Sequence, residues 1–346
     1  MKKIILFALC ILWSGFLSAQ DNTELMIINP GRETFAHFPS ATLGNKYNLT
    51  VFLPEPFVPL KGRYPLAVVL GIGAEESEAA ETFLQTDKMI VAGVNFTEKD
   101  YNEPEKIVRF VSKELLPYLE TNYPVLPGEK NRVIVAKGKG GARVALLLAG
   151  IPKTFGATAL LSPGDALRAF VLPARGLTRI LAAGTQAELA ATQQALEENG
   201  WEYGPDFALL QNTKNNIWDL LKKDYLLAAK EDLALVSLKG KLAASALSLL
   251  DRESVGLKVT ARLKNATAFD YVPSSLRMSP PFLVWNPSLG ALSALPGAET
   301  GSVKIHFVRE NVNFSVKLRL KKQHKMHKNA FLCKKNTTCQ QFFLDL

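Results

Sequence analysis

Six short apolar runs, separated by segments with helical spacing, constrain the fold of this chain more than any other feature. The runs are unbroken rather than alternating, and they span residues 66–70, 89–95, 132–136, 157–162, 179–183 and 207–211. Continuous apolar runs of this length are typical of strands buried on both faces of a parallel sheet. Their alternation with helices predicts an α/β fold, with a mostly parallel sheet flanked by helices.

Four segments in this region have the spacing of amphipathic or buried helices. Residues 104–122 begin with proline and an acid, as a helix should, and Pro117 predicts a kink or break inside this helix. Residues 141–149 are almost entirely apolar, which predicts a buried helix. Residues 187–199 end at a glycine, a stop signal, and residues 215–229 place their apolar side chains on one side.

The pattern changes near residue 231. Stretches of alternating apolar and polar residues follow, at 256–263, 302–308 and 313–320, separated by proline-containing turns. Short alternating strands without a helical period predict a small β-sandwich, which we expect to be immunoglobulin-like. The sequence therefore predicts an α/β domain over 20–230 and a β-sandwich domain over 231–320.

The first nineteen residues have the pattern of a secretory signal peptide. Lys2 and Lys3 precede a short apolar run, and the small residue Ala19 stands before the expected cleavage point. Cys10 lacks the preceding small residue of a lipid-anchor signal, so plain cleavage is favoured. No run in the chain reaches the length of a transmembrane helix. We expect a secreted or periplasmic protein, with association at the cell surface as a further option.

The net charge of +9, from 41 Lys and Arg against 32 Asp and Glu, is concentrated at the chain ends. Residues 321–346 hold six lysines against Asp345 and predict a basic, poorly ordered tail. The body between the ends is nearly neutral, which argues against a nucleic-acid partner. Cys333 and Cys339 are the only cysteines left after removal of the signal peptide. The sequence allows a disulfide between them but does not decide whether it forms. No cofactor or metal site is indicated.

The order of several segments resembles the putative-esterase (esterase D-like) family of α/β-hydrolases. The similarity covers roughly residues 35–230. It rests on the segments 47–54, 63–70, 113–123, 132–155, 201–207 and 218–221. The resemblance implies an α/β-hydrolase fold and a Ser-His-Asp triad, in which the nucleophile lies in a G-x-S-x-G turn between a strand and a helix.

The turn that matches this motif is residues 136–140, and Gly138 stands where the family has its serine. Glycine has no side chain that can attack a carbonyl. Lys137 and Lys139 flank it, and an ordinary lysine is protonated and not nucleophilic. Two interpretations remain. The turn is an inert remnant, or Lys137, Gly138, Lys139 and Gly140 bind an anion or another ligand at the start of the following helix.

The other two triad positions also depart from the family's pattern. By the same alignment Gln186 takes the place of the acid, although Glu188 lies close by in the sequence. Residues 211–216, which match the region of the family's histidine, contain none. The resemblance with these departures implies that no catalytic residue occupies a triad position.

Three functions follow from these observations. The favoured hypothesis is a secreted esterase-like protein without a triad, which binds a small molecule, a glycan or a protein. The second is an active ester hydrolase whose nucleophile is unaligned, such as Ser40 or Ser162 acting with Glu188 and His37. The third is a surface adhesion or structural protein, in which the β-rich region has the main role.

Overall fold

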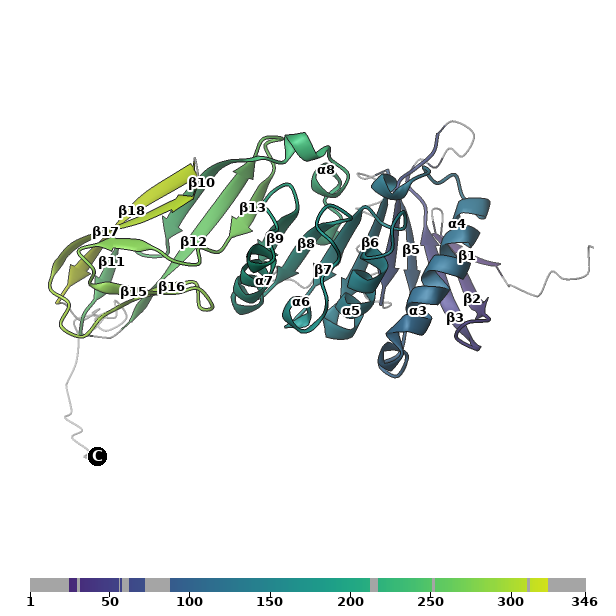
Figure 1. Cartoon of the computed structure of the whole chain (residues 1–346), viewed down its shortest axis with the longest axis horizontal. Coiled ribbons are helices and arrows are strands. Elements are labelled where there is room, and N and C mark those ends of the chain that lie inside the picture. The colour runs from purple at the N-terminus through teal and green to yellow at the C-terminus, as the bar shows by residue number, and fades with distance from the viewer. Residues whose placement is uncertain are drawn as a thin grey trace, which may run out of the picture.

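A path of hydrogen-bonded strands runs along almost the whole length of the elongated molecule (Figure 1). The computed structural model describes residues 25–29, 32–55, 57, 62–71, 88–211, 217–250, 253–309 and 312–322. The predicted signal peptide, the two tail cysteines and the segment 212–216 lie outside these residues.

The centre of the sheet consists of parallel strands, as predicted. The order is β3-β5-β4-β6-β7-β8-β9, and only β3 is antiparallel to its neighbour within this set. Their bounds are β3 (Asn45–Phe52), β4 (Leu66–Leu70), β5 (Ile90–Val94), β6 (Arg132–Lys137), β7 (Ala157–Leu161), β8 (Arg179–Gly184) and β9 (Phe207–Gln211). Every residue of β4, β5 and β7 is buried, which explains why their sequences are unbroken apolar runs.

Two further antiparallel strands extend the sheet beyond β3. They are β1 (Leu25–Asn29) and β2 (Arg32–Ser40), and β2 pairs with both β1 and β3. The outermost strands of this part are therefore antiparallel, while the centre is parallel, so the sheet is mixed.

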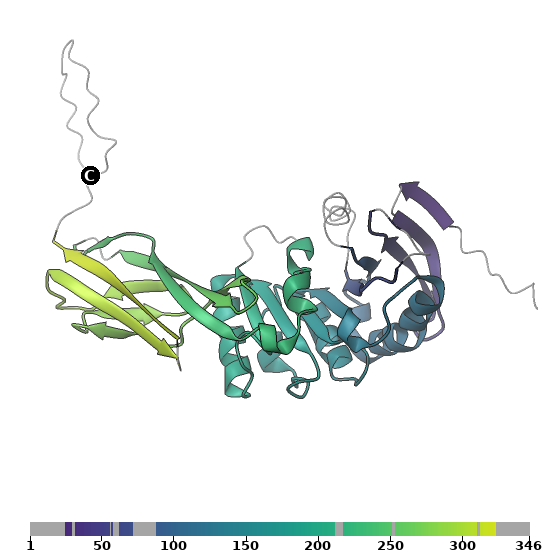
Figure 2. The same cartoon turned by 90° about the horizontal axis from the view of Figure 1, so that it is seen from above.

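Helices cover one side of the central strands (Figure 2). They are α3 (Pro104–Phe110), α4 (Leu116–Asn122), α5 (Gly138–Ala149), α6 (Ala166–Ala169) and α7 (Gln186–Glu198), with short 3-10 turns η1 (Asp100–Asn102) and η3 (Glu129–Asn131). The predicted helix 104–122 is present and contains a π-helical segment, η2 (Val111–Leu115). Pro117 lies two residues after the end of that segment and has no N–H to donate, so the irregularity lies next to the position that the sequence predicts.

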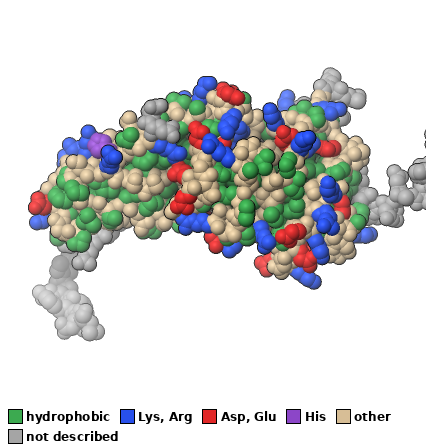
Figure 3. Space-filling model, viewed as in Figure 1, with side chains coloured by type: hydrophobic (Ala, Val, Ile, Leu, Met, Phe, Trp, Pro, Cys, Tyr) green, Lys and Arg blue, Asp and Glu red, His purple; other side chains and the backbone are tan. Residues whose placement is uncertain are grey.

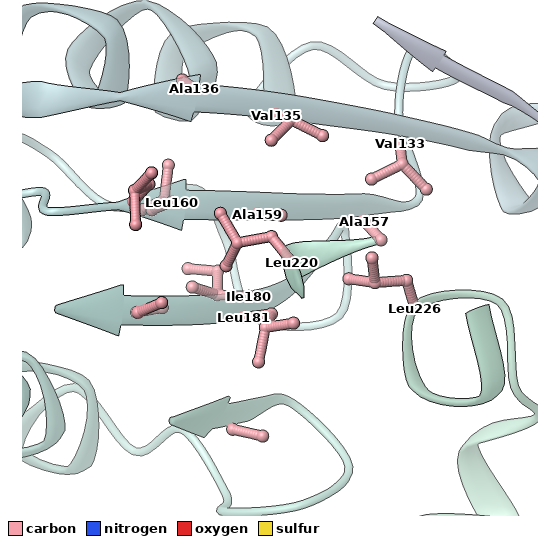
Figure 4. Packing of buried hydrophobic residues seen from close by; sticks show 14 of the residues in the cluster. Val133, Val135, Ala136, Ala157, Ala159, Leu160, Ile180, Leu181, Leu220 and Leu226 are labelled. Atoms are coloured by element: carbon pink, nitrogen blue, oxygen red, sulfur yellow. The ribbon is translucent and has the colours of Figure 1, made fainter. Parts of the chain in front are cut away.

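The helix predicted over 215–229 is wrong for its described part. The chain forms a 3-10 turn η4 (Ile217–Leu220), a short α8 (Lys223–Leu226) and a second 3-10 turn η5 (Lys230–Asp232). Lys222 leaves the helical region with ψ 84, which separates the first two. The apolar spacing reflects burial rather than one helix, because Leu220 and Leu226 pack over the strands β6–β8 (Figure 4).

The chain after residue 235 is built from strands, as predicted. One group continues the large sheet: β10 (Leu235–Leu242), β12 (Ser254–Leu263), β13 (Ala268–Tyr271), β15 (Leu283–Asn286) and β16 (Ala291–Ala294). The other forms a second, four-stranded sheet in the order β11 (Ala246–Ser248), β18 (Val312–Lys321), β17 (Gly301–Arg309) and β14 (Arg277–Ser279). The immunoglobulin-like arrangement stays a prediction.

The large sheet crosses the predicted boundary at residue 231 without a break. Asp270 of β13 pairs with Leu209 of β9, and its carboxylate accepts a hydrogen bond from the Gln211 N–H at 2.7 Å. Arg309 of β17 reaches back to Glu197 of α7 and donates to the Tyr271 hydroxyl at 2.8 Å. Hydrogen bonds and ion pairs therefore join the two regions. Among the helices that the structure describes, none is both long and apolar enough to cross a membrane.

Candidate functional site

The carboxyl ends of the parallel strands β4–β9 meet at one edge of the sheet, where α/β folds place functional groups. Three of the residues that follow these strands have left-handed backbone angles. They are Gly71 (φ 90), Gly138 (φ 72) and Ser162 (φ 48). Ser162 is unusual because such angles disfavour a residue with a Cβ. The backbone thus turns sharply at this edge.

Gly138 lies at the junction between β6 and α5, which is the strand-to-helix turn that the resemblance implies. An ideal Cβ on Gly138 would meet no atom within 4 Å in the described part of the chain. The left-handed backbone therefore points this position into open space. The sequence predicts that Gly138 stands at the family's nucleophile position, and a glycine has only hydrogen in place of a side chain.

Tyr101 forms one wall of the turn. Its ring lies so close to Gly140 that a Cβ there would be 3.1 Å from the Tyr101 Cβ and Cγ. The Tyr101 hydroxyl lies near Gly71, 3.6 Å from an ideal Cβ on that glycine. Burial, and secondarily the charge of Asp100, raises the pKa of Tyr101 to about 12. The phenol is consequently neutral at physiological pH, and a side chain at Gly140 would require the Tyr101 ring to shift.

The beginning of α5 carries positive charge. Lys137 is the N-cap residue and makes no side-chain capping bond, and the first turn of α5 contains no acid. The Lys139 Nζ lies 2.8 Å from the Asp165 Oδ1, and this hydrogen bond lowers the pKa of Asp165. The N–H groups and dipole of a helix start attract anions. The predicted ligand residues Lys137, Gly138, Lys139 and Gly140 thus form a turn suited to a negative group.

Gln186, which the sequence predicts at the position of the family's acid, holds two regions together. Its Nε2 donates to the Pro287 carbonyl at 3.2 Å, and its side chain packs against Gly290. The nearby Glu188 is part of a capping box, in which its Oε2 accepts hydrogen bonds from the Thr185 N–H at 2.8 Å and hydroxyl at 2.9 Å. Both side chains have structural contacts.

The residues of the unaligned alternative are spread across the sheet. His37 lies exposed on β2, and five strand spacings, about 24 Å at the usual separation, lie between β2 and β7, which Ser162 follows. Ser40 is buried in the β2–β3 turn, where its Oγ accepts from the Leu43 N–H at 3.0 Å. In the described structure, His37 therefore does not lie close to Ser162.

A groove of about 320 Å³ opens at the same edge, beyond β9. Its lining combines Gln186 and Gln211 with Lys241, Lys258 and Asp270 from the β-rich region, together with apolar groups such as Leu289. The Lys258 Nζ pairs with the Asp270 Oδ1 at 2.9 Å. Both regions of the chain thus line one concavity of mixed polar and apolar character, and Gln186 is part of its wall. In the described ranges no group of His, Cys, Asp and Glu has the geometry of a metal site.

The family model of the Putative esterase matches residues 40–218, slightly more than half of the sequence. The chain belongs to the Putative esterase family. The match includes the turn at Gly138 and ends at Trp218. No curated protein matches the sequence.

Several solved structures resemble this Putative esterase family member. An uncharacterised protein from Capnocytophaga ochracea is 20% identical, over 58% of this chain and 62% of that protein, with a TM-score of 0.39. The ferulic acid esterase of Anaeromyces mucronatus is 15% identical over 62% of this chain and 95% of its own, with a TM-score of 0.41. The enterochelin esterase of Shigella flexneri is 16% identical over 56% and 58%, with a TM-score of 0.42.

Two features of this esterase-family site escape sequence reasoning. Tyr101 lies in the short turn η1, far in sequence from the glycines that it contacts, and no local pattern marks it. The contact between Gln186 and Pro287 joins residues 101 positions apart. The sequence predicts Gln186 at the acid position, but its hydrogen-bond partner Pro287 is visible only in three dimensions.

Proposed function

We propose that this member of the Putative esterase family is a secreted or periplasmic protein that has lost the Ser-His-Asp triad and binds a ligand or partner without catalysis. The observation that carries the proposal is Gly138. It lies at a sharp strand-to-helix turn, has φ 72 and faces open space. A serine hydrolase needs a hydroxyl at this point, because the attacking oxygen begins the reaction.

The other triad positions support the same proposal. The amide of Gln186 cannot orient an imidazole as a carboxylate does, and it is hydrogen-bonded to Pro287. The segment 211–216 has no histidine in its sequence. Removing one triad member from a serine protease costs about 10⁴-fold or more in kcat, and combined removal leaves little beyond binding and oxyanion stabilisation.

The retained turn supports binding of a negative group such as a carboxylate or phosphate. Lys139 is half-exposed and its present partner, Asp165, is also exposed, so an incoming anion can replace that carboxylate. Exposed ion pairs contribute at most about 1 kcal/mol, so the exchange costs little. The groove lined by Gln186 and Lys241 lies at the same edge of the sheet, but none of the residues 137–140 lines it.

The test of lost catalysis is ester hydrolysis by the purified mature chain. We expect the rate with p-nitrophenyl acetate and with a feruloyl ester to equal that of a heat-inactivated sample, and a fluorophosphonate probe to leave the protein unlabelled. An active feruloyl esterase serves as the positive control. Turnover that survives further purification, with a labelled serine located by mass spectrometry, would refute the proposal.

The Ser162→Ala variant tests the one alternative that a specific observation favours. Ser162 has a strained φ of 48 at the carboxyl end of β7, which is where a functional hydroxyl could lie. If the wild-type chain hydrolyses esters and Ser162→Ala does not, Ser162 is the nucleophile and the protein is an active hydrolase. Ser40→Ala is the matched control, because its hydroxyl is engaged in a turn.

Anion binding at the turn is tested with inorganic phosphate. Phosphate should raise the thermal midpoint of the wild-type chain and do so less for Lys139→Gln, because a ligand that binds only the folded state stabilises it. Lys130→Gln removes the same charge from an exposed site in η3 and is the matched control. Equal shifts for all three proteins would show that the turn does not bind the anion.

A further inference from the structure

Five basic side chains share the solvent side of the four-stranded sheet β11-β18-β17-β14. We call this surface the basic sheet face. Its cations are Arg277 of β14, Lys304 of β17, and Lys317, Arg319 and Lys321 of β18, all of them exposed. They recur at every second position because successive side chains of a strand point to opposite sides. The intervening residues, such as Leu318 and Ile305, are buried.

The register places like charges against each other on the basic sheet face. Lys304 lies directly opposite Lys317. Like charges directly opposite in a sheet are destabilising. In the described part of the structure, none of the five cations forms an ion pair with an acid. A bound polyanion would supply the missing counter-charge.

The charge of the body is unevenly distributed, which the near-neutral total conceals. Residues 235–320 contain 11 Lys and Arg against five Asp and Glu, a net charge of +6, whereas residues 4–234 have a net charge of −4. The body is nearly neutral in total because two regions of opposite charge cancel. Figure 3 shows Lys and Arg side chains gathering with a histidine at the end of the molecule that β17 and β18 form.

Hydroxyl groups accompany the cations. A shallow groove of about 310 Å³ on this sheet is lined by Lys317, Arg319 and Lys321 together with Ser245 and Ser302. The three cations of β18 are spaced by about 6.7 Å, two residues of an extended strand. The groove thus offers a regular row of positive charges with hydrogen-bonding hydroxyls beside it.

We propose that the basic sheet face binds an acidic polysaccharide, a linear glycan with carboxylate or sulfate groups. The cations match its charges, and the serines match its hydroxyls. No aromatic side chain is exposed among the described residues of β14, β17 and β18, whereas proteins that hold single-stranded nucleic acid stack bases on aromatic rings. Val308 is the one strongly exposed apolar residue of these strands, too little to anchor in a membrane. This proposal does not rest on the proposed function of the turn at Gly138.

The experiment compares two triple variants of the full chain. Lys304→Gln/Lys317→Gln/Arg319→Gln neutralises the basic sheet face. Arg109→Gln/Lys113→Gln/Lys130→Gln removes three exposed charges from the helix-covered region and is the matched control. Lysines beyond residue 321 are the same in both variants, so their contribution cancels. Heparin supplies sulfate groups, polygalacturonate supplies carboxylates, and neutral dextran is the blank.

We expect the face variant to bind heparin and polygalacturonate about tenfold more weakly or worse, and to lower the slope of log Kd against log salt by about one for each lost cation. The control variant should bind within about twofold of the wild-type chain. The face variant should fold normally, with a thermal midpoint at or above that of the wild-type chain, since it removes the repulsion between Lys304 and Lys317.

Three results would overturn the proposal. The first is an equal loss of binding in both variants, which would indicate general charge attraction. The second is preference of the wild-type chain for duplex DNA or for vesicles of phosphatidylserine over both glycans. The third is absence of binding to either acidic glycan at low salt. Retention of heparin alone would restrict the ligand to sulfated chains.

Discussion

Gly138→Ser introduces a hydroxymethyl group at the strand-to-helix turn, and the cost of this change in stability can be worked out from the backbone. Gly138 has φ 72, and a residue with a Cβ pays about 1–2 kcal/mol for the left-handed region. An ideal Cβ at this position meets no atom within 4 Å, so no clash adds to the cost. We therefore expect the free energy of unfolding to fall by about 1 kcal/mol.

Gly44→Ser is the matched control for stability. Gly44 has φ 69, and its Cβ would also meet nothing within 4 Å, but it lies in the turn between β2 and β3. Urea unfolding at neutral pH, followed by far-ultraviolet circular dichroism, should give the same loss for both variants. A loss several kcal/mol larger for Gly138→Ser would show that the turn is not open, and the reasoning would fail.

The same variant tests the proposed loss of the catalytic triad. A hydroxyl without a neighbouring base is a poor nucleophile, so Gly138→Ser should not hydrolyse p-nitrophenyl acetate above the wild-type background. It should also remain unlabelled by a fluorophosphonate. If it gains turnover or its new serine is labelled, a base lies within reach, and only the nucleophile has been lost.

Three further predictions follow from buried or shared contacts. Burial raises the pKa of Asp206, but hydrogen bonds from Lys230 and Arg175 outweigh burial and lower this pKa overall. The free energy of unfolding of the Asp206→Asn variant should therefore be about 2–3 kcal/mol lower than that of the wild-type chain at pH 7. This difference in stability, measured by urea unfolding, should vanish as the pH falls through the pKa of Asp206 in the folded state, which is below 3.8. The control Asp232→Asn removes an exposed ion pair and should change the free energy of unfolding by at most about 0.5 kcal/mol. The Gln186→Ala variant loses the hydrogen bond to Pro287, so its free energy of unfolding should fall by about 1 kcal/mol. Amide hydrogen exchange should become faster in the residues around Pro287. Tyr101→Phe should remove one phenol that ionises near pH 12 in a spectrophotometric titration; loss of a phenol titrating near pH 10 would contradict its burial.

The parallel sheet was predictable because its strands are buried on both faces. Each run, from 66–70 to 207–211, became a strand within about one or two residues of its expected ends. Local chemistry sufficed there, since burial on both faces makes such strands predominantly apolar. The turn at Gly138 was also predictable, because strand, glycines and helix follow one another in the sequence.

Long-range relations account for what sequence reasoning missed. The apolar spacing of 215–229 predicted one helix, but side chains such as Leu220 and Leu226 pack on the sheet from separate short turns. The row formed by Lys304 and Lys317 depends on the register of β17 against β18, which no periodicity reveals. Counting the charge of each region separately would have indicated the excess of positive charge in residues 235–320, because the total charge of the body combines a negative and a positive region.

The sheet that passes from β9 into β13 has a consequence for any attempt to divide this protein. A fragment that stops at residue 230 would leave β9 without its outer neighbour and uncover Leu209 and the N–H of Gln211. Unpaired strand edges recruit other chains. Cutting there would therefore expose the edge of β9, and we expect the fragment to self-associate in solution before any loss of activity could be measured.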